Sequence, residues 1–279
     1  IVFGFLGPNG SGKTTTIRLL LGLLEPTSGK AQVLGYDTKN QSGEIRQRSG
    51  ALLEHTGLYE RMTAEDNLEF YGRVWRIPAE KRHTRIKELL SNLDLWDRRR
   101  EVVGNWSRGM KQKLAIARAL LHQPELVFLD EPTAGLDPIA AASLRDDLEN
   151  LAAQHGVTVF LTTHNLAEAE KLCDSIAVIR EGKLLAMGSP DTLRLGNTSN
   201  HLEITGRKFS EQALSLLRQR PEVGSVYQED SHLMVELKDN PDTAQLVSLL
   251  AANGVLIDEV QKGKASLEEV FLALMEEEK

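Results

Sequence analysis

Residues 7–14 have the residue types and spacing of a phosphate-binding loop. They read Gly-Pro-Asn-Gly-Ser-Gly-Lys-Thr, which fits the pattern of glycine, four residues, then Gly-Lys and Ser or Thr. Glycines let successive backbone N–H groups turn toward phosphate oxygens, and a following helix presents its positive end. Lys13 would neutralise charge on the terminal phosphates, and Thr14 would ligate magnesium. A glycine-rich turn without a ligand is the alternative, which the expected strand before this segment and the helix after it disfavour.

Two adjacent carboxylates, Asp130 and Glu131, end the apolar run at residues 126–129. A carboxylate at the carboxyl edge of a parallel sheet lies where ligands of such folds bind, so Asp130 can order magnesium through its water ligands. Glu131 points elsewhere and could polarise an attacking water as a general base. Alone, such a pair is more often a solvated strand end. The phosphate loop upstream favours the catalytic interpretation.

A Ser-Arg-Gly turn and a histidine complete the candidate residues. Ser107 and Gly109 precede an apolar-periodic helix, so this turn is a second candidate anion site. A serine there can also simply cap its own helix. His164 follows the apolar strand at residues 157–161, where a histidine is often only a structural hydrogen-bonding group. The order of the four features along the chain favours a joint catalytic role.

The elements that must position these residues alternate between strand and helix. Strands are expected at residues 1–6, 31–34, 50–53, 126–129 and 157–161, with a closing hairpin of strands 175–179 and 183–186. Helices are expected at 15–24, 110–121 and 140–154, and a helical region at 63–93 with Thr63 as its cap. This alternation predicts an α/β fold with a largely parallel sheet covered by helices.

The C-terminal third has a different pattern. Residues 189–200 are rich in Gly, Ser, Asn and Pro and are predicted to be a linker. Beyond them the expected order is strand, helix, two strands, helix, strand and a final helix, which suits a small ferredoxin-like α+β sandwich without a motif for chemistry. We therefore predict a catalytic domain at 1–188 and an accessory domain at 201–279.

Together, five ordered motifs resemble those of the nucleotide-binding subunits of ABC transporters, over residues 1 to about 188. The phosphate loop matches residues 7–14, the signature motif 106–111, the magnesium strand 126–131, the D-loop 134–137, and the switch histidine His164. The resemblance implies a P-loop NTPase fold of the ABC ATPase type with a helical subdomain. It also implies ATP and Mg²⁺ as cofactors, and hydrolysis of ATP.

The resemblance also implies a set of site residues. The implied nucleotide-binding residues are Gly7, Pro8, Asn9, Gly10, Ser11, Gly12, Lys13, Thr14, Thr15, Glu54, Ser107 and Gly109. The implied metal-binding residues are Thr14, Asp130 and Glu54, and the implied catalytic residues are Glu131 and His164, whose imidazole would contact the γ-phosphate. In this family the signature turn of one subunit closes over ATP held by a second. A homodimer or a paired ABC subunit is therefore implied, with Ser107 and Gly109 acting in trans and Asp137 at the subunit boundary.

Three departures from the family pattern are visible. Glu54 stands where a glutamine is common, and its negative charge beside phosphates would alter the hydrolysis rate or metal dependence. The signature reads Trp-Ser-Arg-Gly-Met instead of Leu-Ser-Gly-Gly-Gln, and Arg108 is either an added cation near the phosphates or a solvated side chain. The aromatic residue that stacks on adenine normally precedes the phosphate loop. Because the sequence opens at Ile1 inside an apolar strand, we expect the natural N-terminus to lie upstream.

Composition narrows the cellular setting. A net charge of −7 argues against nucleic acid as the main partner, and the single cysteine, Cys173, permits no intrachain disulfide and favours the cytosol. Apolar runs fall short of the roughly 20 residues that cross a bilayer. We expect a protein on the cytoplasmic face of the cell membrane, bound to separate membrane-spanning permease subunits. The resemblance implies that residues 54–76 contact the membrane subunit, where Tyr59, Met62 and Trp75 would form an apolar docking surface unless they pack in the core.

The final run at residues 265–271 resembles the C-terminal extension of drug, antibiotic and lipid exporters. It favours export over import, although the cargo cannot be read from this chain. A soluble ABC ATPase acting on ribosomes or repair complexes is the second hypothesis. The single cassette and the acidic charge count against it. A regulatory module that binds ATP without hydrolysis is the third, and it would require an idle Glu131.

Overall fold

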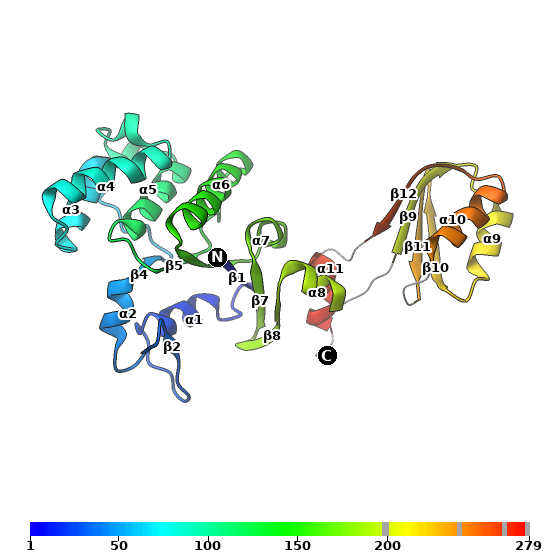
Figure 1. The fold of residues 1–279 in the computed structure, drawn as a ribbon, viewed down its shortest axis with the longest axis horizontal. Helices are drawn as coiled ribbons and strands as arrows, with labels where there is room; N and C mark the ends of the chain where they lie inside the picture. The colour runs from blue at the N-terminus through cyan, green and yellow to red at the C-terminus, as the bar shows by residue number, and fades with distance from the viewer. Residues whose placement is uncertain (197–200, 239–241, 264–266, 277–279) are drawn as a thin grey trace. The chain divides into compact units, whose positions relative to one another are not determined.

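In the computed structural model the chain divides into two units, Ile1–Pro190 and Asp191–Lys279, each with its own sheet (Figure 1). The structure describes residues 1–196, 201–238, 242–263 and 267–276. Within these ranges no helix is both long and apolar enough to cross a bilayer. The two units are described separately below.

The first unit is built on a six-stranded sheet with the order β4-β5-β6-β1-β7-β8. Its strands are β1 (Val2–Leu6), β4 (Ser49–Leu52), β5 (Leu126–Asp130), β6 (Thr158–Thr163), β7 (Ser175–Arg180) and β8 (Lys183–Gly188). All neighbours are parallel except β7 and β8, which form the predicted hairpin. The parallel α/β architecture predicted from the sequence is thus confirmed. Because β5, β6 and β1 are parallel neighbours, their carboxyl ends meet at one edge.

Helices cover this sheet and form a separate group beside it. The helices are α1 (Lys13–Leu20), α2 (Ser42–Arg48), α3 (Ala64–Val74), α4 (Ala79–Asn92), α5 (Arg108–Leu120), α6 (Pro138–His155) and α7 (Leu166–Leu172). Short elements are β2 (Gln32–Val33), β3 (Tyr36–Asp37) and the 3₁₀ turns at Trp96–Arg98 and Val103–Asn105. Figure 1 shows α3, α4 and α5 grouped together, and they contact one another, which forms the helical subdomain.

The helical region expected at residues 63–93 consists of two helices. Thr63 caps α3 as predicted, because its side chain accepts a hydrogen bond from Asp66 N. The helix ends before Trp75, and α4 begins after Pro78. The chain leaves the helix at Arg76, which has a φ of +55°. Proline lacks an N–H and disfavours helical geometry at the residue before it, so Pro78 keeps Ile77 out of both helices.

Apolar side chains fix α1 and α2 against the sheet. Ile17 of α1 and Ile45 of α2 are fully buried in one cluster with Leu126 and Phe128 of β5. Burying a side chain of this size contributes about 1.5–3 kcal/mol of transfer free energy. The start of α1, which carries the end of the phosphate loop, is therefore held firmly near the carboxyl ends of the strands.

The single cysteine lies beneath β1. Cys173 is buried at the end of α7, and a Cβ added to Gly4 of β1 would be 2.7 Å from its Sγ. Burial, together with the nearby carboxylates Glu168 and Asp174, raises the pKa of this thiol to about 12. Glycine at position 4 is thus required by close packing.

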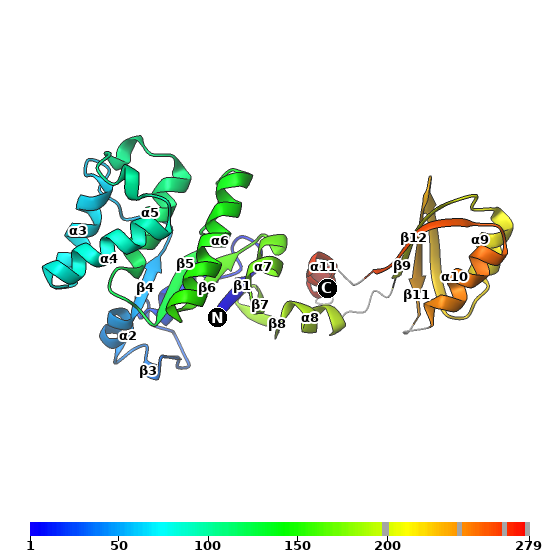
Figure 2. The ribbon, with the colours of Figure 1, turned by 45° about the horizontal axis from the view of Figure 1, so that its top comes forward.

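The second unit contains a four-stranded antiparallel sheet with the order β10-β11-β9-β12. Its elements are β9 (His201–Arg207), α9 (Glu211–Arg218), β10 (Val223–Glu229), β11 (His232–Leu237), α10 (Thr243–Ala252), β12 (Leu256–Gly263) and α11 (Leu267–Glu276). Figure 2 shows α9 and α10 on one face of this sheet, over a core that includes Ile204, Leu217 and Leu250. This strand order and the helix placement confirm the predicted ferredoxin-like sandwich.

The segment expected to be a linker contains a short helix, α8 (Pro190–Gly196). Pro190 occupies the first helical position, where its fixed φ suits a helix and its missing N–H costs nothing. Asp191 lies in the first turn and pairs with Arg194, with 3.0 Å between Oδ1 and Nη1. Proline and aspartate also occur in turns, which is why the composition suggested a linker. The remaining residues of that segment, 197–200, lie outside the described ranges.

Candidate active site

The phosphate loop joins β1 to α1 and depends on two glycines. Gly10 and Gly12 have φ of +81° and +106°, a backbone region that other residues adopt only at a cost. No side chain caps the N-terminus of α1, so its first N–H groups are free of side-chain acceptors. The hydroxyl of Ser11 is buried and lacks a hydrogen-bond partner among the described residues. An uncapped helix end beside an unpartnered hydroxyl fits a bound phosphate group.

Lys13 is buried within this loop, with a side chain that is only 6% exposed. Its Nζ donates hydrogen bonds to the carbonyl oxygens of Gly7 (2.8 Å) and Pro8 (3.1 Å). It also lies 3.2 Å from Oε1 of Glu131. A buried ammonium requires such partners because it has left water. The predicted phosphate-neutralising residue is therefore next to the predicted general base.

Asp130 and Thr14, both predicted to bind metal, contact each other directly. Thr14 Oγ1 donates to Asp130 Oδ2 at 2.6 Å. Thr162, on the neighbouring strand β6, donates to the other oxygen, Oδ1, also at 2.6 Å. Carboxylate and hydroxyl oxygens are ligands that Mg²⁺ prefers, so the donor set fits this ion.

Glu131 and His164 are brought together at the ends of β5 and β6. His164 Nδ1 lies 3.1 Å from Glu131 Oε2, with side-chain exposures of 54% and 26%. Glu131 has a φ of +48°, and its N–H donates to both the carbonyl oxygen (3.1 Å) and the hydroxyl (3.0 Å) of Thr162. A left-handed, non-glycine residue costs about 1–3 kcal/mol and persists only where its surroundings fix it. The proposed base is thus held in a strained, defined position.

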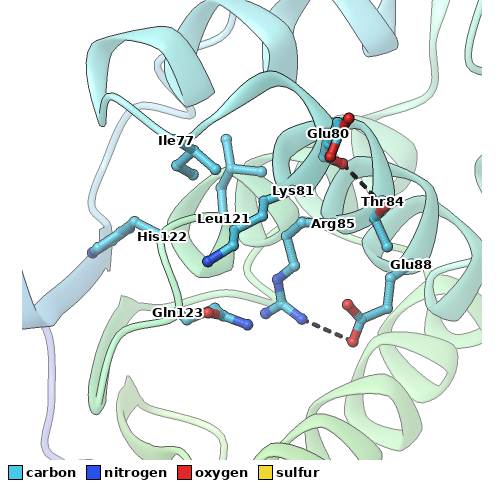
Figure 3. A pocket seen from close by; sticks show the side chains of 9 residues that line it. All are labelled: Ile77, Glu80, Lys81, Thr84, Arg85, Glu88, Leu121, His122 and Gln123. Carbon is cyan, nitrogen blue, oxygen red and sulfur yellow. Dashed lines mark hydrogen bonds and ion pairs between the residues drawn. The ribbon is translucent and has the colours of Figure 1, made fainter.

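These two side chains border a cavity of 390 Å³. Its other walls come from the turn after β5, from α6 and from α7. A larger cavity, of 550 Å³, lies between α4 and the end of α5 (Figure 3). The residues that line it are Ile77, Glu80, Lys81, Thr84, Arg85, Glu88, Leu121, His122 and Gln123. None of them belongs to the predicted site, so cavity size does not mark the chemistry in this chain.

The signature turn begins α5 and contacts a different part of the same unit. The Ser107 hydroxyl accepts a hydrogen bond from Met110 N at 3.3 Å, so the capping role that the sequence left open is present. A Cβ added to Gly109 would lie 3.1 Å from Cβ of Ala140 on α6. The guanidinium of Arg108 fills the space where Gly135 would carry a Cβ. Whether Ser107 and Gly109 bind nucleotide stays a prediction.

Glu54 and Asp137 have partners of their own. Glu54 Oε2 lies 3.5 Å from Arg18 Nη2 on α1, and both side chains are exposed, at 69% and 41%. Among the described residues, Glu54 makes no hydrogen bond or ion pair with Thr14 or Asp130, so its metal role stays a prediction. Asp137 caps α6 by accepting hydrogen bonds from the N–H groups of Ile139 and Ala140.

The sequence did not single out four residues that hold the predicted ones in place. Thr162 contacts both Asp130 and Glu131, while Thr163 and Thr133 both bond to Glu168 of α7. In the sequence, the only sign of Thr162 and Thr163 was that they directly precede His164. Their contacts with the site residues depend on the register of β5 against β6, which places Asp130 opposite Thr162.

Comparisons with known proteins agree with this geometry. The ABC transporter family matches residues 2–134, and the C-terminal domain of ATP-binding proteins of the DrrA1-3 type matches residues 188–275. The bacitracin transport ATP-binding protein BcrA of Bacillus licheniformis is 37% identical over 98% of this chain and 88% of its own length. The daunorubicin resistance ATP-binding protein DrrA3 of Streptomyces coeruleorubidus is 36% identical over 98% and 86%.

A solved ATP-binding subunit of an ABC transporter superposes with a TM-score of 0.61 at 32% identity, covering 70% of this chain and 81% of the other. The motif order, the shared strand edge and these similarities agree on one assignment. This chain belongs to the ABC transporter family, as an ATP-binding subunit with ATPase activity that powers transport.

Proposed function

We propose that the chain binds Mg²⁺-ATP on residues 7–15 and hydrolyses it as half of a head-to-tail pair, driving export through separate membrane subunits. One observation carries the proposal above all. Lys13, Glu131 and His164 follow three parallel strands, and Glu131 contacts both of the others: its Oε1 lies 3.2 Å from Lys13 Nζ, and its Oε2 lies 3.1 Å from His164 Nδ1. The uncapped N-terminus of α1 lies beside them. Phosphate binding and water activation therefore have adjacent groups.

The chemistry divides among the residues of this edge. The loop N–H groups and Lys13 would hold the phosphates, and Thr14 and Asp130 would hold the metal. Mg²⁺, when bound, supplies positive charge that offsets the charge of the phosphate oxygens. Glu131 would accept a proton from the attacking water, and His164 would orient that carboxylate from its other side. The strained backbone of Glu131 favours a single orientation.

The signature turn supports the pairing of two chains. Ser107 and Arg108 are exposed. Within one chain, this turn lies against Gly135 and Ala140. A second copy could therefore receive this helix N-terminus over its own phosphate loop. Each chain would then supply two halves of different active sites, and the partner could be an identical or a related subunit.

The membrane partner would bind near the helical subdomain. Tyr59 and Trp75 are 46% and 37% exposed, which disfavours pure core packing. Tyr59 contacts the ring of Phe70 edge-on, with 4.9 Å between centroids, and Trp75 stacks on His122 at 3.9 Å. A cavity of 340 Å³ adjoins this aromatic group. Exposed aromatic clusters of this kind are typical of protein interfaces, here on the cytoplasmic side of the membrane.

Export of a drug-like or antibiotic cargo is proposed from the relatives. BcrA and DrrA3 are described as serving bacitracin transport and daunorubicin resistance, and the C-terminal unit matches the domain of the second group. The cargo itself would be selected by the membrane subunits.

The decisive test is Glu131→Gln in the full-length chain. We expect ATP to bind about as tightly as in the wild type, while turnover falls about 10²- to 10⁴-fold because the general base is lost. The trapped ATP-bound pair should elute as a dimer in size-exclusion chromatography.

The matched control is Glu125→Gln, which neutralises a carboxylate just before the opposite end of β5, where it pairs with Arg48. Its turnover should stay near that of the wild type. Normal turnover in Glu131→Gln would refute the assignment of the general base.

A further inference from the structure

We propose that Glu168 is a positioning residue that sets the geometry of the Glu131–His164 pair, and this proposal rests on the proposed function of that pair. Glu168 lies on α7 and is only 2% exposed. A single oxygen, Oε2, accepts hydrogen bonds from the hydroxyls of Thr133 (2.8 Å) and Thr163 (3.1 Å). It contacts neither catalytic side chain, so it would act through these threonines.

Each of the two threonines lies close in sequence to one of the catalytic groups, one on the turn after β5 and the other at the end of β6. Thr133 is two residues after Glu131, and Thr163 immediately precedes His164. One carboxylate oxygen therefore connects the turn after β5 with the last residue of β6. This connection adds to the hydrogen bonds that Glu131 N donates to Thr162, so it would help to set the spacing between general base and histidine.

Glu168 is itself held by the start of its helix. Its N–H donates to Oδ1 of Asn165, the N-cap of α7, at 3.1 Å. The N–H of Asn165 in turn donates to Oγ1 of Thr163 at 2.9 Å. Thr163, Asn165 and Glu168 thus form a closed ring of hydrogen bonds that spans His164 in sequence. The carboxylate is in a fixed position relative to both threonines.

The strained backbone of Glu131 requires constraints of the kind that this ring supplies. A residue with φ of +48° stays there only if constraints act on both sides of it. Thr162 constrains the N–H of Glu131 from β6. On the other side, Ala134 N donates to Glu131 O at 3.1 Å, and Thr133 is tied to Glu168. Removing the carboxylate would release this second side.

Stability alone does not account for a carboxylate here. The other oxygen, Oε1, is buried and unpartnered within the part of the chain that the structure describes. An apolar side chain of similar volume would avoid the cost of taking this charge out of water. What an apolar side chain cannot do is accept two hydroxyl hydrogen bonds at once.

The main test compares Glu168→Ala with Glu168→Gln in the full chain. Glu168→Ala should lower kcat about 10- to 100-fold, because small displacements of reacting groups have effects of this size. The Kd for ATP should change less than about twofold, since ground-state binding groups are untouched. Glu168→Gln keeps one acceptor oxygen and should restore most of kcat.

A double-mutant cycle separates positioning from general loss of structure. Thr133→Val removes one donor with little change of volume, and it should also lower kcat. In Thr133→Val with Glu168→Ala, kcat should fall no further than in Glu168→Ala alone, because the shared contact is already lost. If the two substitutions only destabilised the fold independently, their effects on kcat would add instead.

The matched control is Asp147→Asn, a buried carboxylate on α6 that pairs with Lys113 at 2.8 Å. Its kcat should stay near that of the wild type. The proposal is overturned if Glu168→Ala and Thr133→Val both retain wild-type kcat, or if their effects add. A failure of the proposed function looks different, since Glu131→Gln would then hydrolyse ATP normally.

Discussion

Two helices of the first unit, α1 and α5, begin at glycine-containing turns that resemble each other in sequence but not in structure. α1 starts after Gly12 without a side-chain cap, and its first residue, Lys13, is buried among loop carbonyls and Glu131. α5 starts after Ser107, which caps it, and Ser107 and Arg108 are exposed. One helix end is thus organised to hold a ligand within its own chain, whereas the other is satisfied internally and presented outward.

This difference supports the proposal that two chains together form each complete active site. The end of α1 has beside it the groups proposed to bind phosphate and metal and to activate water. At the end of α5, the Ser107 hydroxyl accepts a hydrogen bond from Met110 N, and the side chains of Ser107 and Arg108 are exposed. The following variants test whether the two ends differ in this way.

Lys13→Ala should have the largest effect. Its ammonium contacts Gly7, Pro8 and Glu131, so the loop loses both its internal bonds and its charge. A charge-assisted contact of this kind is worth up to about 3 kcal/mol, which corresponds to a loss of ATP affinity of about 100-fold. Titration calorimetry measures it. Lys39→Ala, at an exposed pair with Glu25, is the control and should bind normally.

Ser107 variants should have an intermediate effect and separate capping from catalysis. Ser107→Ala should lower the free energy of unfolding by about 1 kcal/mol, and Ser107→Gly by only a few tenths, because glycine is a tolerated cap. Both should lower ATP turnover about tenfold, since both remove the same hydroxyl donor from the paired site. Thermal melts and steady-state rates measure the two quantities. If turnover followed stability instead, Ser107 would be only a cap.

Arg108→Ala should have the smallest effect. The guanidinium lies against Gly135 of its own chain, which favours the solvated alternative over the added cation. We expect ATP affinity and turnover to change less than about twofold, as for most exposed substitutions. A drop of tenfold in affinity, seen only at concentrations where chains pair, would show instead that Arg108 reaches ATP in the partner.

Much of the site could be predicted because its residues follow strands directly. Asp130 and Glu131 end β5, and residues 7–14 follow β1, so parallel neighbours bring them to one edge. Thr162 and Glu168 could not be predicted in the same way. Their contacts depend on the register of β5 against β6 and on where α7 begins, and neither is encoded in a local pattern.

Glu54 has a partner that was not predicted, because Arg18 competes with the proposed metal site for its carboxylate. Thr14 and Arg18 are four residues apart on one face of α1, so the cation of Arg18 is close to the proposed metal residues and pairs with Glu54. The sequence indicated that Glu54 lies near the site, but it did not indicate the competing ion pair with Arg18. The break between α3 and α4 at Pro78 was visible in the sequence, but the long apolar periodicity around it suggested one helical region.

The buried position of Cys173 means that its chemical labelling can report local opening of the structure around β1 and α7. With its pKa raised to about 12, very little of this thiol is ionised at pH 7, and the ionised form is the one that reacts with alkylating reagents. The sulfur also lies against Gly4, on the strand that leads into the phosphate loop. Slow labelling of this one thiol therefore records how often β1 and α7 separate, and ATP bound to the loop would be registered as a change in that frequency.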